Sequence, residues 1–96
     1  MKIHFTELAQ DDLANIVSHI AKDNVDAAYR VRDAVLDTFD MLLENPLIAE
    51  EVESATDGLR RAVVTDFPTY LIFYLPVSDG IKILRVGSGR QDWNDI

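Results

Sequence analysis

The sequence predicts an α+β fold in which an antiparallel two-helix hairpin packs on a small antiparallel sheet. Three observations support this prediction: an alternating segment at residues 2–6, two segments of helical periodicity between residues 7 and 45, and three β-rich segments after Gly58. The expected order is β-α-α-β-β-β, arranged as two layers around one core. A chain of 96 residues is long enough for a single domain spanning residues 1–96.

The N-terminal segment predicts a short strand followed by a helix. Ile3 and Phe5 alternate with polar neighbours, and Thr6 is a suitable N-cap for the helix after it. Apolar residues then recur at helical spacing, namely Ala9, Leu13, Ile16, Val17 and Ile20. This pattern is typical of a surface helix with one buried stripe.

A second amphipathic helix follows after only two residues. Asp23 is expected to cap it, and Pro46 should end it at Asn45, because the residue before proline avoids the α conformation. A joint this short predicts an antiparallel helical hairpin. Residues 47–57 carry four acids and no base, which indicates a loop or a poorly ordered connector.

Three β-rich segments make up most of the second half, at residues 59–65, 69–77 and 81–86. The run from Tyr70 to Leu75 is apolar on both faces, so we expect it to be the central strand. Residues 78–80, with the sequence SDG, predict a hairpin turn between the last two strands.

Composition excludes several classes of function. The chain has no cysteine, which excludes disulfides, thiolate nucleophiles and cysteine metal sites. Its net charge of −8 argues against a generic binder of nucleic-acid phosphates. No apolar run is long enough to span a bilayer, and the first residues do not resemble a signal peptide, so we expect a soluble cytoplasmic domain. His4 and His19 lie on different elements, and we expect neither a metal site nor a cofactor.

The charge is distributed unevenly, and the second half holds a cluster of arginines. Residues 1–57 carry thirteen acids and four bases, whereas residues 58–96 carry four acids and five bases. Arg60 and Arg61 should face opposite sides of a strand, so one of them can share a face with Arg85. Such a cluster could hold a phosphate, stabilise developing negative charge or bind an acidic partner; alternatively, it neutralises the acids of the helices.

The C-terminal tail leaves two questions open. Residues 87–90, with the sequence GSGR, could form an anion-binding nest or a flexible exit from the sheet. Trp93 could pack back on the core or anchor a partner.

An ordered series of segments covers nearly all of the chain, and together they resemble the ParE/RelE superfamily of toxins from bacterial type II toxin–antitoxin modules. The segments are FTELAQDDLANIVSHIAKDNVDAAYRV, LLENPLI, GLRRAVV, YLIFYLPVSDGIKILRV and GRQDW. Members of this superfamily share a two-helix hairpin on an antiparallel sheet, so the resemblance implies the same fold. It also implies a location in the bacterial cytoplasm.

Within the superfamily, the series ending in RQDW looks more like the ParE branch. That likeness implies inhibition of DNA gyrase by direct binding, with growth inhibition and plasmid stabilisation as its consequences, and no catalysis by the chain itself. It places the target-binding residues at Arg85, Arg90, Asp92 and Trp93. One departure is Ser88, because many relatives carry a histidine before the corresponding stretch.

The alternative is a RelE-like, ribosome-dependent mRNA endonuclease, and a non-toxic relative that still binds an antitoxin is a third possibility. An endonuclease would use Arg60, Arg61, Arg85 and Arg90 for charge stabilisation at the scissile phosphate. The net charge of −8 opposes docking among ribosomal RNA, which favours the gyrase branch.

The resemblance also implies the partners of the chain. A cognate ParD-like antitoxin, with a ribbon–helix–helix DNA-binding domain, would form a toxin–antitoxin hetero-oligomer with it. The antitoxin would supply the DNA binding, so we expect no direct DNA or membrane binding by this chain. We expect the antitoxin segment to occupy the apolar flank between helix and sheet edge.

Overall fold

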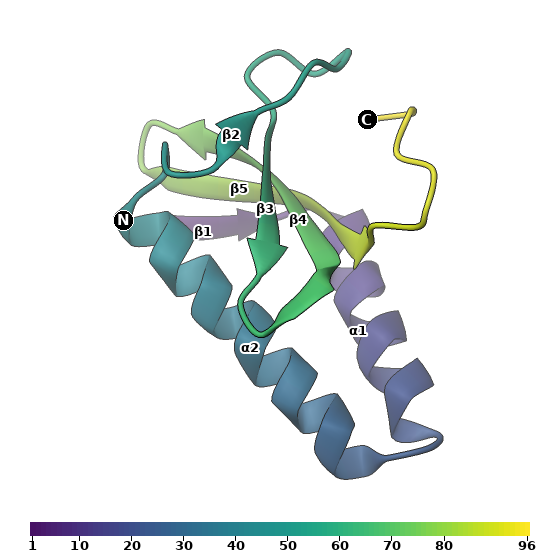
Figure 1. Cartoon of the computed structure of the whole chain (residues 1–96). Helices are drawn as coiled ribbons and strands as arrows, with labels where there is room; N and C mark the ends of the chain where they lie inside the picture. The colour runs from purple at the N-terminus through teal and green to yellow at the C-terminus, as the bar shows by residue number, and fades with distance from the viewer.

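A computed structural model describes all residues, 1–96, and it contains two helices and five strands (Figure 1). The elements in chain order are β1 (Lys2–Phe5), α1 (Glu7–Ala21), α2 (Val25–Glu44), β2 (Glu50–Glu51), β3 (Arg60–Val64), β4 (Phe67–Val77) and β5 (Gly80–Ser88). The strands form one sheet in the order β1-β5-β4-β3-β2. β4 is therefore the central strand, as the sequence predicts.

The core lies between the helical hairpin and one face of the sheet, which confirms the expected fold class. The largest side chains buried in it include Phe39 and Leu42 from α2, and Ile72 and Tyr74 from β4. The Tyr74 hydroxyl donates a hydrogen bond of 2.7 Å to the carbonyl oxygen of Pro46, and burial raises the pKa of this phenol. Neither helix has the length and apolarity needed to cross a membrane.

The helix ends follow the expected capping pattern with one correction. The Thr6 hydroxyl accepts a 3.0 Å hydrogen bond from the Ala9 N–H and caps α1, as predicted. The cap of α2 is Asn24 and not Asp23, because the Asn24 side chain accepts the Ala27 N–H at 2.9 Å. α2 ends at Glu44, directly before Asn45, as Pro46 requires.

The sequence predicted an antiparallel sheet, but the sheet is mixed, because β1 pairs in parallel with β5 while the other pairs are antiparallel. Lys2 lies opposite Gly80 in this register. Gly80 has a φ of 153°, and a Cβ there would collide with the carbonyl oxygen of Lys2. The glycine of the predicted turn therefore also permits the close approach of β1.

The connector at residues 47–57 is more ordered than the sequence predicts, and it contains the short strand β2. Glu50 pairs with Arg61 and Glu51 with Arg60 along the edge of β3. A run of acids is a poor strand signal, so this pairing was not predicted. The two arginines opposite the two glutamates supply its charge complement.

An irregularity in the β4–β5 pairing decides which side chains of β5 face the core. Tyr74 pairs with Ile83 but Phe73 pairs with Arg85, so Leu84 is an extra residue in β5. Strict alternation would place residue 85 on the same face as Ile83, toward the helices. The bulge instead turns Arg85 to the opposite face and brings Val86 into the core.

Candidate functional site

The face of the sheet that carries Arg85, opposite the helices, is here called the outer face. Its central row contains Arg61 on β3, Phe73 on β4 and Arg85 on β5, because these three residues are paired across the strands. Neighbouring strands lie about 4.8 Å apart, so the two arginine backbones are separated by about 10 Å. As predicted, one residue of the Arg60–Arg61 pair shares a face with Arg85, and it is Arg61.

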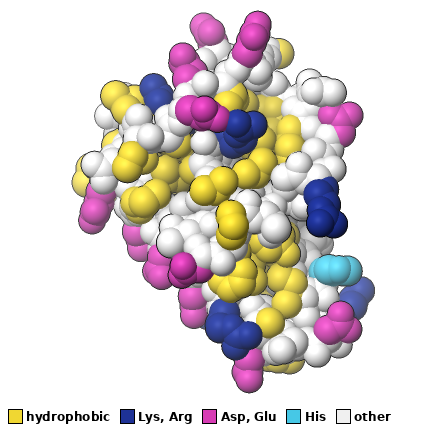
Figure 2. All heavy atoms as spheres, in the orientation of Figure 1, with side chains coloured by type: hydrophobic (Ala, Val, Ile, Leu, Met, Phe, Trp, Pro, Cys, Tyr) yellow, Lys and Arg dark blue, Asp and Glu magenta, His cyan; other side chains and the backbone are white.

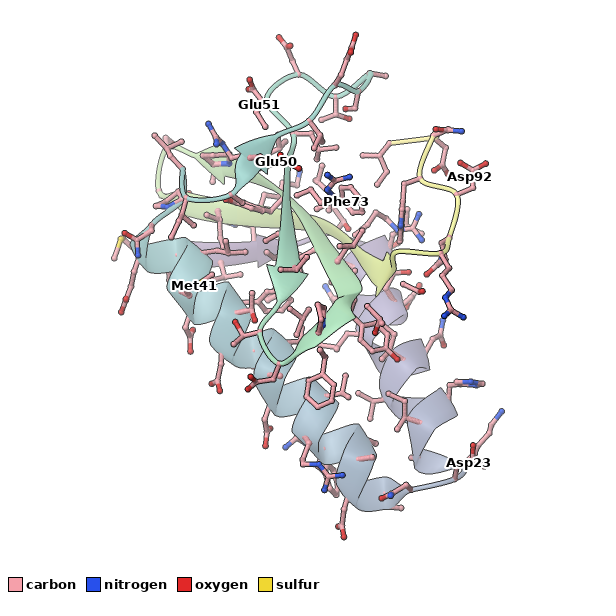
Figure 3. The ribbon with its side chains drawn as sticks, viewed as in Figure 1. Asp23, Met41, Glu50, Glu51, Phe73 and Asp92 are labelled. Carbon is pink, nitrogen blue, oxygen red and sulfur yellow. The ribbon has the colours of Figure 1, made fainter.

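The C-terminal segment, residues 89–96, adds Trp93 to this row. The indole lies 4.9 Å from the Phe73 ring, centroid to centroid, at an interplanar angle of 48°. The Arg85 guanidinium carbon lies 5.1 Å from the indole centroid, within cation–π range. The indole N–H donates a 3.0 Å hydrogen bond to the carbonyl oxygen of Ser88. In Figure 3, Phe73 lies on the sheet and Asp92 on the C-terminal segment.

Gly87 provides the space that Trp93 occupies. A Cβ at this position would lie 2.5 Å from the indole ring, a distance that real side chains do not adopt. Of the two possibilities for Trp93, the structure therefore shows packing of the indole, although against the outer face and not in the core between sheet and helices.

Asp12 of α1 fixes the position of Arg85. Its carboxylate accepts hydrogen bonds from Arg85 Nε at 2.8 Å and Nη2 at 3.0 Å, and one of its oxygens also accepts the Val86 N–H at 3.0 Å. Both side chains are mostly buried, with exposed fractions of 15% for Asp12 and 21% for Arg85. The hydrogen bonds to Asp12 raise the pKa of Arg85 above its ordinary value, so these contacts stabilise the charged guanidinium.

The remaining predicted residues do not join this cluster. Arg60 faces the other side of β3 and donates to the carbonyl oxygens of Leu47 and Ala49, at 3.2 and 2.6 Å. Arg61 forms an ion pair with Glu50. The exposed Asp92 accepts the Asn94 N–H at 3.0 Å in a local turn. The side chain of Arg90 is exposed and has no ion-pair partner within 4 Å.

The residues 87–90 do not form an anion-binding nest, because their N–H groups already have acceptors. The Ser88 N–H donates to the Gln91 side chain at 3.0 Å, the Gly89 N–H to the Thr69 carbonyl at 2.8 Å, and the Arg90 N–H to the Ser88 hydroxyl at 3.2 Å. The same hydrogen bonds tie this exit from the sheet to Thr69 and Gln91.

The outer face therefore carries the half-buried Trp93 packed on Phe73, which is buried. Two arginines flank this pair, and each has a carboxylate partner. Tryptophan and arginine are the residue types that most often dominate the binding energy of protein interfaces. No group of three or more His, Asp or Glu side chains lies in an arrangement that could hold a metal ion. In the space-filling view of Figure 2, hydrophobic side chains lie across the middle of the visible face and acidic side chains lie mostly around its margin. The geometry of the outer face is suited to contact with another macromolecule.

A second surface, here called the helical groove, lies between α1 and α2 and is bounded by Phe5. It encloses about 620 Å³. Its lining is almost entirely apolar and consists of Phe5, Ala9, Gln10, Leu13, Ala14, Val17, Arg32, Leu36 and Phe39. Phe5 and Leu36 remain 41% and 42% exposed, so the groove opens to solvent. Phe5 belongs to the edge strand β1, so the groove lies beside this edge of the sheet.

Sequence reasoning missed three residues of the outer face: Asp12, Phe73 and Gly87. Asp12 belongs to the polar face of an amphipathic helix, where most acids are solvated. Phe73 lies inside an apolar run whose residues are indistinguishable by pattern. Gly87 did carry a signal, because an isolated glycine inside a strand indicates a bulge or a close approach of another group.

The chain belongs to the ParE family. The model of the family described as "ParE toxin of type II toxin-antitoxin system, parDE" matches residues 3–93, which is nearly the whole chain. No curated protein sequence matches the chain. It is therefore a toxin-family component of a type II toxin–antitoxin system.

Solved structures share the fold at low sequence identity. A chain of the chromosomal ParDE toxin–antitoxin system of Pseudomonas aeruginosa has a TM-score of 0.74 at 18% identity, covering 92% of this chain and 95% of the other. YafQ from Escherichia coli has a TM-score of 0.65 at 17% identity, covering 92% of each chain. A chain of the E. coli DinJ–YafQ complex gives 0.64 at 16% identity, covering 91% and 90%.

Proposed function

We propose that this chain inhibits DNA gyrase by direct binding through the outer face of its sheet, and that a cognate antitoxin neutralises it. The observation that supports this best is the contact of Trp93 with Phe73 and Arg85. It places an aromatic–arginine cluster on a face that no helix covers. Membership of the ParE family supports a function as a toxin. The cluster of Trp93, Phe73 and Arg85 is the surface that we assign to the target.

The contacts that the arginines already make favour a function in target binding over one in RNA cleavage. Arg85 is paired with Asp12 and Arg61 with Glu50, so both guanidinium groups of the central row already have anionic partners. Stabilising a scissile phosphate requires cationic donors that can turn to the developing charge. Arg60 donates to backbone carbonyls of the connector on the other face. Among the four predicted arginines, Arg90 alone has no such contact, so a cleavage site that uses the other three would have to break these contacts first.

The helical groove is the surface that we assign to the antitoxin. It is apolar, open to solvent and lined by side chains of both helices, which suits the apolar face of an inserted amphipathic helix. Two of the structural neighbours come from toxin–antitoxin systems, namely ParDE and DinJ–YafQ. We propose a ParD-like antitoxin that carries its own DNA-binding domain, so that this acidic chain need not touch DNA.

The test is a supercoiling and DNA-cleavage assay with purified gyrase and the purified chain. We expect inhibition by the natural chain and a loss of about tenfold or more with Trp93→Ala, the loss typical of an interface hot spot. Tyr29→Ala is the matched control, because Tyr29 is an exposed aromatic residue of α2, 49% exposed, away from the outer face. Circular dichroism would verify that both variants fold.

Two results would contradict the proposal. Gyrase unaffected by excess chain, together with mRNA cut on translating ribosomes, would favour the endonuclease. Gyrase unaffected and mRNA intact, with antitoxin binding retained, would favour a non-toxic relative.

A further inference from the structure

A pocket, here called the polar pocket, lies where the second half of α1 meets the start of β4 and the end of β5. It encloses about 360 Å³, a volume typical of sites for small ligands. Tyr70 pairs with Ser88, and both face the helices, because they alternate in phase with the core residues Ile72 and Val86. The residues that line the pocket are Asn15, Ile16, His19, Tyr70, Ser88 and Gln91.

The polar side chains of this pocket keep hydrogen-bond donors that the fold does not use. The side chains of Asn15, His19 and Tyr70 make no hydrogen bond within the chain. The Ser88 hydroxyl accepts a backbone N–H at 3.2 Å, and the Gln91 side-chain oxygen accepts the Ser88 N–H at 3.0 Å. The Ser88 O–H and the Gln91 amide NH2 therefore remain free to donate. Five side chains with unused donors line one pocket.

The lining of the polar pocket contains no acidic residue, although the chain holds 17 acids. Lys22, one turn after His19, and Arg90, between two lining residues in the chain, are exposed cations without ion-pair partners. Asp11 and Asp12 lie one turn before the pocket on α1, and Asp12 already has an ion-pair partner. In Figure 2, the histidine over α1 lies between two Lys or Arg side chains at the margin of the visible face. A ligand oxyanion would meet donors and no carboxylate in the lining.

The floor and the rim of the pocket suit the flat base of a nucleotide. Ile16 and Tyr70 are half-buried and pack against the core, so the floor is apolar and partly aromatic. Asn15 and Gln91 are exposed, so their amides lie at the rim. Aromatic side chains stack on nucleobases, and an Asn or Gln amide can form paired hydrogen bonds with the edge of adenine.

We propose that the polar pocket binds a nucleoside monophosphate. The base packs against Tyr70, and its edge bonds the Asn15 amide. The phosphate accepts hydrogen bonds from the Ser88 hydroxyl and the His19 ring, and the two free cations beside the pocket favour its charge.

The polar pocket is separate from both surfaces that we assign to protein partners. It lies on the helix side of the sheet, opposite the outer face. Leu13 and Val17 of the helical groove are each two residues from Asn15, so they lie on the other side of α1. The proposal therefore goes beyond the proposed function and can fail without it.

A longer nucleic acid is a poorer occupant than a single nucleotide. It carries one phosphate for every nucleotide, and the net charge of −8 opposes the approach of such a polyanion. A single phosphate can be held by the local donors of the pocket alone.

The test measures binding of AMP, adenosine and inorganic phosphate to the purified chain by isothermal titration calorimetry. We expect saturable binding of AMP. Adenosine and phosphate should each bind about tenfold or more weakly, because each lacks one half of the ligand. In an NMR titration with AMP, the amide shifts should centre on Ser88 and Gln91 and not on Phe73 of the outer face.

Two protein variants separate the two halves of the ligand. Asn15→Ala should weaken binding of AMP and of adenosine by similar factors, because it removes the contact to the base. His19→Ala should weaken AMP about tenfold and leave adenosine unchanged, because it removes a donor to the phosphate. His4→Ala is the matched control: His4 is the other histidine, lies on β1 outside the pocket, and should not alter AMP binding. Circular dichroism would verify that the variants fold.

The proposal is overturned if AMP does not bind saturably, or if adenosine or phosphate alone binds as tightly as AMP. Full affinity for AMP in folded Asn15→Ala and His19→Ala variants would also overturn it. A single-stranded oligonucleotide that binds the pocket about tenfold or more tightly than AMP would make the occupant a nucleic acid, which contradicts the proposal.

Discussion

The two edges of the sheet differ in how far side chains satisfy their free backbone groups. Beyond the end of β1, the free edge of β5 is closed by side chains of the α1 start: the Thr6 hydroxyl donates to the Leu84 carbonyl at 2.7 Å, and Asp12 accepts the Val86 N–H. Beyond the end of β2, the edge of β3 is closed only at Thr65, through Thr38. A helix that follows its strand directly can cap the neighbouring edge, whereas β2 is only two residues long and leaves most of its neighbour uncovered.

The difference matters for function because only the closed edge is coupled to the outer face. Asp12 bonds the β5 backbone and Arg85 with the same carboxylate, and Arg85 contacts Trp93. A change at this edge therefore alters both the stability of the fold and the aromatic cluster. The open edge of β3 has no such link to Trp93, so the exposed Val63 on this edge can change with little effect on the fold.

The largest effect is expected at the closed edge. Asp12→Ala leaves a mostly buried guanidinium and the Val86 N–H without their acceptor, which should lower the free energy of unfolding by about 2–4 kcal/mol. Urea unfolding measures this loss, and the fluorescence of Trp93, the only tryptophan, should report a more exposed indole. Asp11→Ala, at an exposed neighbouring position, is the control and should change little. Equal stability of the two variants would refute the coupling.

An intermediate effect is expected where the β3 edge is closed by Thr38. Thr38→Val keeps the shape of this buried side chain but removes the acceptor of the Thr65 N–H. The free energy of unfolding should fall by about 1 kcal/mol, since the Thr65 N–H can be partly hydrated instead. Thr69→Val, on the exposed start of β4, serves as the comparison in the same urea series. A loss as large as that of Asp12→Ala would show that the two edges do not differ.

A smaller effect is expected at the β2–β3 pair. Arg61 and Glu50 are 43% and 66% exposed, so solvent screens their ion pair. Arg61→Ala should cost no more than about 0.5 kcal/mol in unfolding free energy, and a double-mutant cycle with Glu50→Ala isolates the coupling between the two. A coupling energy above about 1 kcal/mol would mean that β2 closes this edge more firmly than its length suggests.

The smallest effect concerns pH at the turn where β1 meets β5. The hydrogen bond from His4, at 2.9 Å, lowers the pKa of the Asp79 carboxyl below its ordinary value. Because its pKa is lowered in the folded state, the ionised carboxyl stabilises the fold at pH values above its ordinary pKa of about 3.9. This contribution is lost as the pH falls through the folded-state pKa. In thermal unfolding between about pH 5 and pH 2, the melting temperature of His4→Gln should therefore fall slightly less with decreasing pH than that of the natural chain. Identical profiles would remove His4 as the cause.

The sequence alone determined the fold class, the main elements and several of their boundaries, because these depend on local patterns. Apolar spacing placed both helices, Thr6 marked the first cap, and Pro46 fixed the end of α2. The run around Ile72 was identified as the central strand because both of its faces are apolar. Alternation also predicted that one residue of the Arg60–Arg61 pair can share a face with Arg85, but not which of the two.

Only the tertiary structure decided which residues meet. The bulge at Leu84 turns Arg85 away from the core, the parallel pairing of β1 requires the space at Gly80, and Trp93 lies where Gly87 has no side chain. Asp12 contacts Arg85, which lies seventy-three residues further along the chain, only because α1 packs beside the edge of β5. Contacts at this separation depend on register and packing in three dimensions, and a one-dimensional pattern of polar and apolar residues does not specify them.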